Sequence, residues 1–250
     1  GRLFVYAGPL YHTDPCESQA EAAETMSILK RFPALIFDFD GTLIDSAPDI
    51  ALGLNRLLVA ERRGELSLAE VHRMIGDGAA RLVEQAFAAT GDALAPDAVG
   101  PMTARYLDIY GALPADPSCL YPGVRDTLAA LKASGHRLGL CTNKPAGISH
   151  DLLRDLGLAP FFDAVAGGDT VAQKKPHPAP LLWVMDRLGV DATGAVMVGD
   201  NANDGAAARG ASVSVVAVSY CYPRMALEAL GADTIIDRFA DLPAALAQLP

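Results

Sequence analysis

The chain has 250 residues, of which 51% are hydrophobic, and a formal net charge of −10. This composition predicts a folded protein with one large domain, or with a core domain that carries a smaller one. The excess of acidic residues argues against binding to nucleic acid or to an anionic membrane, because both require clustered Lys and Arg. No apolar run approaches the roughly 18 residues of a membrane span, so we expect a soluble, cytoplasmic protein.

The start of the chain and its cysteines add little to the functional assignment. The hydrophobic residues of 1–32 follow neither the helical nor the strand period well. We interpret these residues as an appended extension in which 17–31 could form a helix. Four cysteines are widely separated along the chain: Cys16, Cys119, Cys141 and Cys221. They form neither a CxxC pair nor a Cys/His cluster with metal spacing, which indicates a reducing environment and no zinc site.

From residue 33 onward, short apolar strands alternate with helices, which predicts a parallel sheet covered on both faces. The predicted strands are 34–40, 137–142, 163–167, 194–199, 213–219 and 234–237. Helices are predicted at 123–134 and 179–188, ended by Gly135 and Gly189. The sequence therefore predicts a doubly wound α/β fold.

The stretch 46–121 shows helical patterns and no convincing strand, which predicts an inserted helical domain. Ser46 begins a segment that resembles a capping box and opens a helix reaching about residue 60. Further helices are predicted at 67–75, 79–89 and 97–110. We expect a core domain of residues 33–45 and 122–250, with the insertion lying over the carboxyl end of the first strand.

The first predicted strand ends on two acids, Asp38 and Asp40, at the edge where open α/β sheets bind ligands. A lone acid at this position is more often a turn former or a helix cap. Residues two apart in a strand share a face, however, and two carboxylates that close need a cation or a shared proton. Gly41 and Thr42 then supply a tight turn whose backbone N–H groups could cradle an anion.

Three other strand ends, or the loops after them, carry reactive side chains: Thr142, Asn143 and Lys144; Lys174 and Lys175; Asp200 and Asp204. Taken alone, Asp200 and Asp204 indicate helix capping or a turn. Together with Asp38 and Asp40, it supplies the oxygen ligands that Mg²⁺ prefers. The Thr142 hydroxyl and the Lys175 ammonium, each of which more often has a structural role when taken alone, could together hold phosphoryl oxygens.

Residues 34 to 249 resemble the haloacid dehalogenase superfamily, and within it the phosphoglycolate phosphatase-like branch. The matching motifs are DFDGTLIDS (38–46), CTNKP (141–145), GGD with KKPHPAP (167–180) and VGDNANDGAAARGA (198–211). The helical insertion is similar to the small cap of this family, and IGDGAARLVEQAF (75–87) resembles its cap sequence. The resemblance implies a Rossmann-like core with a helical cap domain.

The resemblance also implies a mechanism. Asp38 would attack phosphorus and form an aspartyl-phosphate, while Asp40 would protonate the leaving alkoxide and then activate water. Mg²⁺ would be held by the Asp38 and Asp200 side chains and the Asp40 carbonyl, with Asp204 in support. Phosphate would be bound by Thr142, Asn143, Lys175, Gly41 and Thr42, and Lys175 would also restrain Asp38. Dehalogenases and phosphonatases lack the second acid, so Asp40 predicts phosphate esters as substrates.

The expected activity is Mg²⁺-dependent hydrolysis of 2-phosphoglycolate to glycolate and phosphate. Alternatives are another small phosphate, such as a sugar phosphate, a nucleotide or pyrophosphate, a sugar-phosphate mutase, or a non-catalytic phosphate-binding module. Basic residues in the cap could pair with a substrate carboxylate, although a solvated helix face is the more common role: Arg56, Arg62, Arg63, His72, Arg73 and Arg81. The run from Ser219 to Arg224 departs from the Gly-Tyr-Asn-type turn of this branch and would alter the rim or a subunit contact. The sequence leaves the oligomeric state open.

Overall fold

The computed structural model describes residues 27–28, 31–221 and 230–249. Most of the possible helix over 17–31 lies outside these residues, as does Cys16. The three described cysteines, Cys119, Cys141 and Cys221, are free thiols. Among the helices of the described residues, none combines the length and the hydropathy that a membrane crossing requires.

The core is a parallel six-stranded sheet with the strand order β3-β2-β1-β4-β5-β6. Its strands are β1 (Ala34–Phe37), β2 (Arg137–Cys141), β3 (Ala164–Ala166), β4 (Ala195–Gly199), β5 (Ser214–Val218) and β6 (Thr234–Ile236). Strand β1 lies between β2 and β4, and its four apolar residues are fully buried, as expected for a central parallel strand. The six predicted strands and the doubly wound fold are thereby confirmed.

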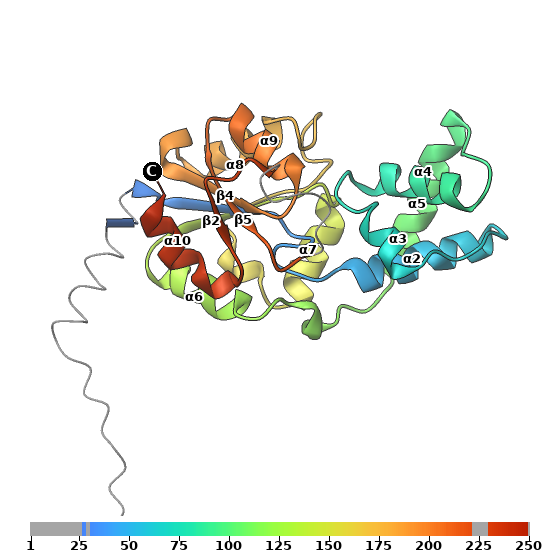
Figure 1. The fold of residues 1–250 in the computed structure, drawn as a ribbon, viewed down its shortest axis with the longest axis horizontal. Helices are drawn as coiled ribbons and strands as arrows, with labels where there is room; N and C mark the ends of the chain where they lie inside the picture. The colour runs from blue at the N-terminus through green and yellow to red at the C-terminus, as the bar shows by residue number, and fades with distance from the viewer. Residues whose placement is uncertain (1–26, 29–30, 222–229, 250) are drawn as a thin grey trace, which may run out of the picture.

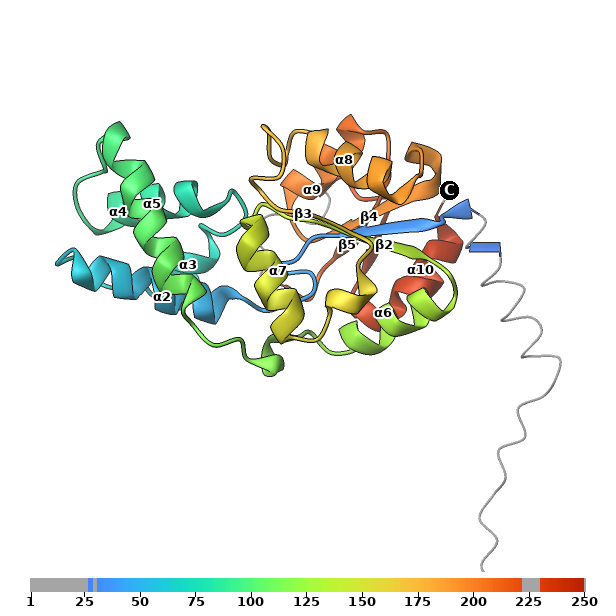
Figure 2. The same cartoon turned by 180° about the vertical axis from the view of Figure 1, so that it is seen from behind.

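Helices cover both faces of this sheet (Figures 1 and 2). They are α6 (Val124–Ala133), α7 (Ala146–Asp155), α8 (Ala179–Leu188), α9 (Ala202–Gly210) and α10 (Leu242–Gln248), with short 3₁₀ turns at Pro117–Cys119, Ala159–Phe161, Ala192–Gly194 and Phe239–Asp241. Apolar residues of α6, α7 and α10 pack in one core cluster with Phe37 and Phe239. Those of α8 and α9 pack in a second cluster with Ile36 and Met197 on the opposite face.

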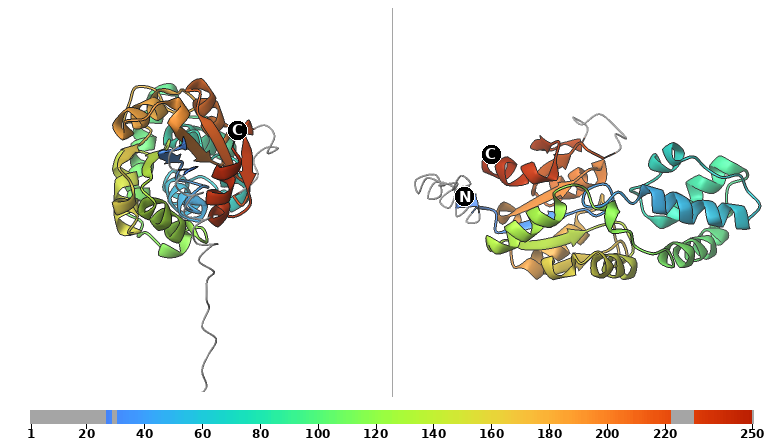
Figure 3. Two further views of the ribbon diagram at one scale, coloured as in Figure 1. Left: turned by 90° about the vertical axis from the view of Figure 1, so that its left-hand side faces the viewer. Right: turned by 90° about the horizontal axis from the view of Figure 1, so that it is seen from below.

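The insertion forms a separate helical lobe beyond one end of the sheet (Figures 1 and 3). Its helices are α2 (Ala47–Ala60), α3 (Leu68–His72), α4 (Ala79–Thr90) and α5 (Pro96–Gly111). They surround their own hydrophobic cluster, which includes Leu57, Val83, Phe87 and Tyr106. The expectation of helices without strands in this stretch is confirmed.

The predicted capping box at Ser46 is wrong. Ser46 is the N-cap of α2, but its side chain makes no cap hydrogen bond. Its backbone is helical, with φ −91° and ψ −4°, whereas a capping side chain needs the extended conformation to reach back to the first turn. A complete capping box begins α3 instead, where Ser67 is extended and exchanges hydrogen bonds with Glu70.

The two segments that join the insertion to the core run side by side. The Asp45 N–H donates to the Cys119 carbonyl at 2.7 Å, and the Tyr121 N–H donates to the Leu43 carbonyl at 3.1 Å. Ile44 bridges Leu120 between these two bonds in an antiparallel pairing. The insertion therefore leaves and rejoins the core at one place, directly after β1, while the exact domain boundaries stay a prediction.

Candidate active site

Asp38 directly follows β1 at the carboxyl edge of the sheet. Its N–H continues the ladder to the Val198 carbonyl at 2.9 Å, and its Oδ1 accepts the Phe39 N–H at 2.7 Å. Only 8% of the residue is exposed. Burial, and then the neighbouring charge of Asp204, raise the pKa of Asp38 to about 6.

Lys175 lies at the centre of the site and is 2% exposed. Its Nζ is 3.0 Å from Asp38 Oδ1, 2.6 Å from Asp204 Oδ1 and 2.6 Å from the Cys141 carbonyl oxygen. Burial disfavours the ammonium, but the two carboxylates outweigh it and raise the pKa of Lys175 above its ordinary value. Lys175 is thus a buried ammonium group that holds Asp38, as expected, whereas its contact with phosphate stays a prediction.

The Asp38, Asp200 and Asp204 carboxylates form one cluster, with an oxygen of each within 4.8 Å of the others. Asp200 accepts a hydrogen bond from the Thr42 hydroxyl at 3.0 Å. The position of Gly41, at φ +89°, keeps room for this carboxylate, since a Cβ there would lie 2.5 Å from Asp200 Oδ2. Clustered carboxylate oxygens without His or Cys fit a hard divalent cation such as Mg²⁺.

Asp204 is 1% exposed and is committed to structural contacts on both oxygens. Its Oδ1 accepts from Lys175, and its Oδ2 accepts the Asn201 N–H at 2.9 Å. Asn201 is the N-cap of α9 and forms a capping box with Asp204. The capping interpretation of this segment is therefore correct for Asn201 and Asp204, and it leaves Asp200 as the acid that faces the cluster from β4.

The turn after Asp40 differs from the expected anion cradle. The Gly41 N–H donates to the Ile44 carbonyl at 2.8 Å, and the Thr42 N–H donates to the Phe39 carbonyl at 3.3 Å. Both N–H groups serve to close the turn, because a chain that reverses over so few residues pairs its own polar groups. In this conformation they are not offered to an anion, and the side chain of Thr42 supports Asp200 instead.

Thr142 and Asn143 follow β2, as predicted, and both are buried. The Thr142 hydroxyl accepts the Lys144 N–H at 3.3 Å. The side-chain amide of Asn143 donates to the carbonyls of Gly76 and Lys175, at 2.9 Å each, so it joins the insertion to the core. The predicted phosphate contacts of Thr142 and Asn143 stay predictions.

Lys144 is a site residue to which the sequence pattern assigned no role. Its Nζ is 2.7 Å from Asp40 Oδ1, with side-chain exposures of 4% and 15%. The same Nζ lies 4.7 Å from the ring centroid of Tyr110, in α5 of the insertion. The only signal in the sequence was its place two residues after Thr142 in the CTNKP motif.

A cavity lies between the core and the insertion. Its core side is lined by Asp38, Asp40, Thr142, Asn143, Lys144, Pro145, Ile148 and Asn201. Its insertion side is lined by Ile50, Ile75, Gly76, Gly78, Ala79, Leu82, Tyr106, Leu107 and Tyr110. The insertion thus presents a largely apolar wall to the two acids.

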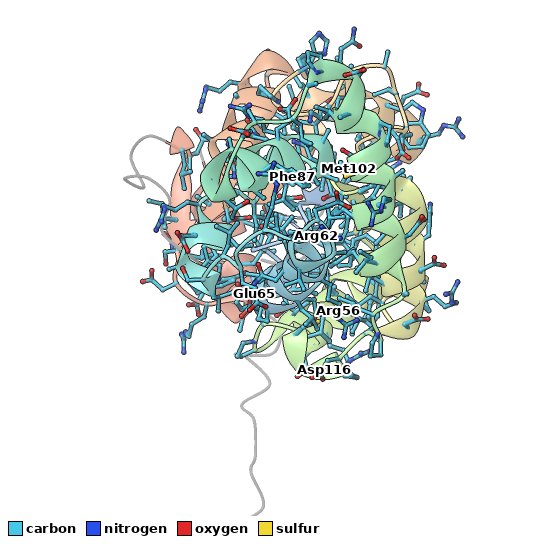
Figure 4. The ribbon with its side chains drawn as sticks, turned by 90° about the vertical axis from the view of Figure 1, so that its right-hand side faces the viewer. Arg56, Arg62, Glu65, Phe87, Met102 and Asp116 are labelled. Carbon is cyan, nitrogen blue, oxygen red and sulfur yellow. The ribbon has the colours of Figure 1, made fainter. Side chains whose placement is uncertain are left out.

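None of the six described basic residues predicted as candidates for a substrate carboxylate lines this cavity. Arg56 and Arg62 lie on the side of the insertion that faces away from the core (Figure 4). Arg63 donates to the Phe87 carbonyl at 2.6 Å, and Arg81 pairs with Glu84 on the surface. Arg73 is also exposed, and His72 is half-buried. A role of these residues in substrate binding is therefore not supported.

Tyr220 belongs to the described part, residues 219–221, of the unusual loop after β5. Its hydroxyl donates to the Thr42 carbonyl at 2.6 Å, and its ring lies against Tyr121, with centroids 4.7 Å apart. The loop therefore braces the turn after Asp40 at the rim of the site. Tyr222, Pro223 and Arg224 lie outside the described residues.

Comparisons with known proteins agree with this geometry. The model of the haloacid dehalogenase-like hydrolase family matches residues 35–218. The chain is 47% identical over 213 residues to a phosphoglycolate phosphatase of Rhodospirillum rubrum, covering 84% of this chain and 88% of the relative. It is 41% identical over 211 residues to a phosphoglycolate phosphatase of Caulobacter vibrioides, covering 84% and 89%.

Solved structures show the same fold. A predicted phosphoglycolate phosphatase from Haemophilus somnus superposes with a TM-score of 0.78 at 33% identity, covering 86% of this chain and 97% of that one. CbbY from Rhodobacter sphaeroides, in complex with phosphate, superposes with a TM-score of 0.72 at 27% identity, covering 84% and 96%. The family match runs from β1 to β5 and includes every strand end of the site. The chain therefore belongs to the haloacid dehalogenase-like hydrolases, and it is an enzyme of their phosphoglycolate phosphatase-like group.

Proposed function

We propose that this enzyme hydrolyses a small phosphate monoester, and that its substrate is 2-phosphoglycolate, which it cleaves to glycolate and phosphate. The observation that carries the proposal is the pair Asp38 and Asp40, which line one cavity and are each held by a different lysine. The relatives named phosphoglycolate phosphatase support the choice of substrate.

In the proposed reaction, the Asp38 carboxylate attacks phosphorus and forms an aspartyl-phosphate. Asp40 gives its proton to the departing alkoxide oxygen, so the alcohol leaves neutral. Asp40 then takes a proton from the water that attacks the aspartyl-phosphate, which releases phosphate and restores both carboxyl groups. With its pKa near 6, Asp38 is mostly ionised, and therefore nucleophilic, at neutral pH.

The Asp38 and Asp200 carboxylates and the Asp40 carbonyl would hold Mg²⁺, with Asp204 supporting the site through Lys175. The ion would supply positive charge close to the phosphoryl oxygens, which offsets the charge that builds up during transfer. Lys175 supplies a second positive charge from the protein itself. Its ion pair with Asp38 also fixes the orientation of the nucleophile.

A second candidate is a phosphatase for a sugar phosphate, whose alcohol carries no carboxylate. None of the described insertion residues that line the cavity carries a charged side chain to meet the carboxylate of 2-phosphoglycolate. A variant of CbbY from Rhodobacter sphaeroides, 28% identical with a TM-score of 0.73, binds xylulose-(1,5)bisphosphate. The two candidates share one mechanism and differ in the alcohol released.

The test measures kcat/KM for 2-phosphoglycolate, a hexose phosphate, a nucleoside monophosphate and pyrophosphate. We expect the highest value for 2-phosphoglycolate. A preference for the sugar phosphate by a factor of about 100, or about 2.7 kcal/mol, would contradict the first choice. Asp38→Asn should abolish turnover without loss of fold, whereas Asp126→Asn on the exposed face of α6 serves as the control. Retained turnover in Asp38→Asn would contradict the mechanism.

A further inference from the structure

The Asp40 carboxylate is held by one described side chain, that of Lys144, with Nζ 2.7 Å from Oδ1. The exposures of 4% and 15% place this ion pair largely out of water. A buried ion pair gives little net stability, because desolvation of both charges offsets their attraction. Its fixed geometry, in contrast, restricts the torsions of the acid. The pair thus contributes more to the orientation of Asp40 than to the stability of the fold.

Lys144 is itself held from several sides. Its backbone N–H donates to the Thr142 hydroxyl at 3.3 Å, and its carbonyl accepts the Gly168 N–H at 2.8 Å. Its ammonium lies over the Tyr110 ring, 4.7 Å from the centroid, and Tyr106 stacks on Tyr110 with centroids 5.8 Å apart. A lysine fixed at both ends can act as a rigid support for its partner.

We propose that Lys144 is a positioning residue for Asp40, holding Oδ1 so that the other oxygen, Oδ2, transfers the proton to and from the substrate. The inference rests on the proposed acid/base role of Asp40. Proton transfer requires a hydrogen bond of about 2.6–3.2 Å between the acid and the leaving oxygen. An Asp40 side chain free to rotate would spend little time in that geometry, although it would remain chemically competent.

The inference predicts a dependence on the leaving group. The alkoxide of glycolate and ethoxide are both poor leaving groups unless they are protonated as they depart. In contrast, p-nitrophenolate leaves without a proton. Loss of a positioned acid should therefore slow the cleavage of alkyl phosphates and spare that of aryl phosphates. Because kcat/KM covers only the steps up to the first irreversible one, it reports on this transfer and not on hydrolysis of the aspartyl-phosphate.

The experiment compares wild type with Lys144→Met, which keeps the length of the side chain and removes its charge. We measure kcat/KM for 2-phosphoglycolate, ethyl phosphate and p-nitrophenyl phosphate. We expect a loss of about 100-fold for both alkyl esters, at the lower end of general acid catalysis, and less than about 10-fold for the aryl ester. Lys144→Arg should recover part of the alkyl activity. Lys132→Met, on the outer side of α6 where the ammonium pairs with Asp163, should leave all three values unchanged.

Two results would overturn the inference. A loss confined to 2-phosphoglycolate would show that Lys144 binds the substrate carboxylate, since ethyl phosphate has none. An equal loss for all three esters would show a purely structural role. If wild type cleaves ethyl phosphate and p-nitrophenyl phosphate but not 2-phosphoglycolate, the proposed substrate is wrong. The comparison of the two cleaved esters then still tests the role of Lys144.

If Lys144→Met does not fold, Tyr110→Leu provides the second variant. It removes the ring beneath the ammonium and leaves the charge in place. We expect smaller losses of kcat/KM in the same order, with ethyl phosphate more affected than p-nitrophenyl phosphate. Equal effects on the two esters in Tyr110→Leu would also overturn the inference.

Discussion

At the scale of single residues, the two acids after β1 are distinguished by their partners. Asp38 pairs with Lys175 from the loop after β3, and Asp40 pairs with Lys144 from the loop after β2. Around Asp38 the carboxylates of Asp200 and Asp204 add two more negative charges, so three carboxylates and one ammonium leave two charges unbalanced. That deficit equals the charge of a divalent cation, which is an electrostatic reason to expect one there.

The raised pKa of Asp38 predicts how stability changes with pH in the metal-free protein. Burial, followed by the charge of Asp204, raises this pKa to about 6, above the value near 4 of an unfolded chain. Between these values the folded state binds more protons, so the free energy of unfolding falls as pH rises. Asp38→Asn removes this dependence. Relative to wild type, its stability should increase by about 2–3 kcal/mol from pH 4 to pH 7, measured by denaturant unfolding in EDTA.

A constant difference between wild type and Asp38→Asn over that pH range would contradict the prediction. Mg²⁺ added at pH 7.5 provides an internal check. It should raise the unfolding midpoint of wild type and have a smaller effect on Asp38→Asn, because an amide is a weaker ligand than a carboxylate.

Gly41→Ala should displace Asp200. The backbone at φ +89° costs an alanine about 1–2 kcal/mol, and its Cβ would lie 2.5 Å from Asp200 Oδ2, so the carboxylate must move. We expect loss of stability of that size and at least a tenfold weaker Mg²⁺ affinity by calorimetry. Gly64→Ala is the control, since its Cβ meets nothing within 4 Å. Unchanged Mg²⁺ affinity in Gly41→Ala would contradict the role given to Asp200.

At the scale of elements, the junction of β4 and α9 carries two acids with different tasks. Asp204 belongs to the helix, where it completes the capping box and holds Lys175. Asp200 directly follows β4 and accepts a hydrogen bond from the Thr42 hydroxyl. This short segment thus contains both a structural acid, Asp204, and the proposed metal ligand, Asp200. Their spacing in the sequence does not show which acid has which role.

Asn substitutions should separate these two tasks. Asp204→Asn leaves the buried Lys175 ammonium with one carboxylate in place of two, and it should lower the free energy of unfolding by about 3 kcal/mol. Asp200→Asn keeps an oxygen that can accept from Thr42, so stability should change by less than about 1 kcal/mol, while Mg²⁺ affinity falls at least tenfold. Denaturant unfolding and calorimetry measure the two effects. The reverse pattern would exchange the assigned roles.

At the scale of the whole molecule, the sequence predicted what depends on local pattern. The apolar strands and the helical insertion followed from hydrophobic periodicity, and the strand ends then placed Asp38, Lys175 and Asp200 at one edge of the sheet. Contacts between distant segments were not predictable in this way. The pairing of Lys144 with Asp40 and the bond from Asn143 to Gly76 depend on how two lobes meet.

The insertion and the core are linked by a small polar contact beside the cavity. Besides the bond from Asn143 to Gly76, Asn203 at the start of α9 donates to Asp77 Oδ1 at 2.8 Å, and Lys174 contacts the Asp77 carbonyl. These groups belong to three different segments of the core. A contact made of a few hydrogen bonds can open and close at low cost, which suits a lobe that admits substrate and then excludes water.

The bond between Asn203 and Asp77 should stabilise the closed arrangement and therefore affect KM. Removing it by Asp77→Ala or Asn203→Ala should raise KM about fivefold, equivalent to about 1 kcal/mol for one hydrogen bond. The double variant should resemble Asn203→Ala, because that substitution already removes the bond to Asp77 together with the longer bond, at 3.4 Å, from Asn203 to the Gly76 carbonyl. Steady-state kinetics with the best substrate measures these values, with Arg81→Ala on the outer surface as the control. If the two effects on KM multiply instead, Asp77 and Asn203 act independently, and this contact does not hold the insertion closed.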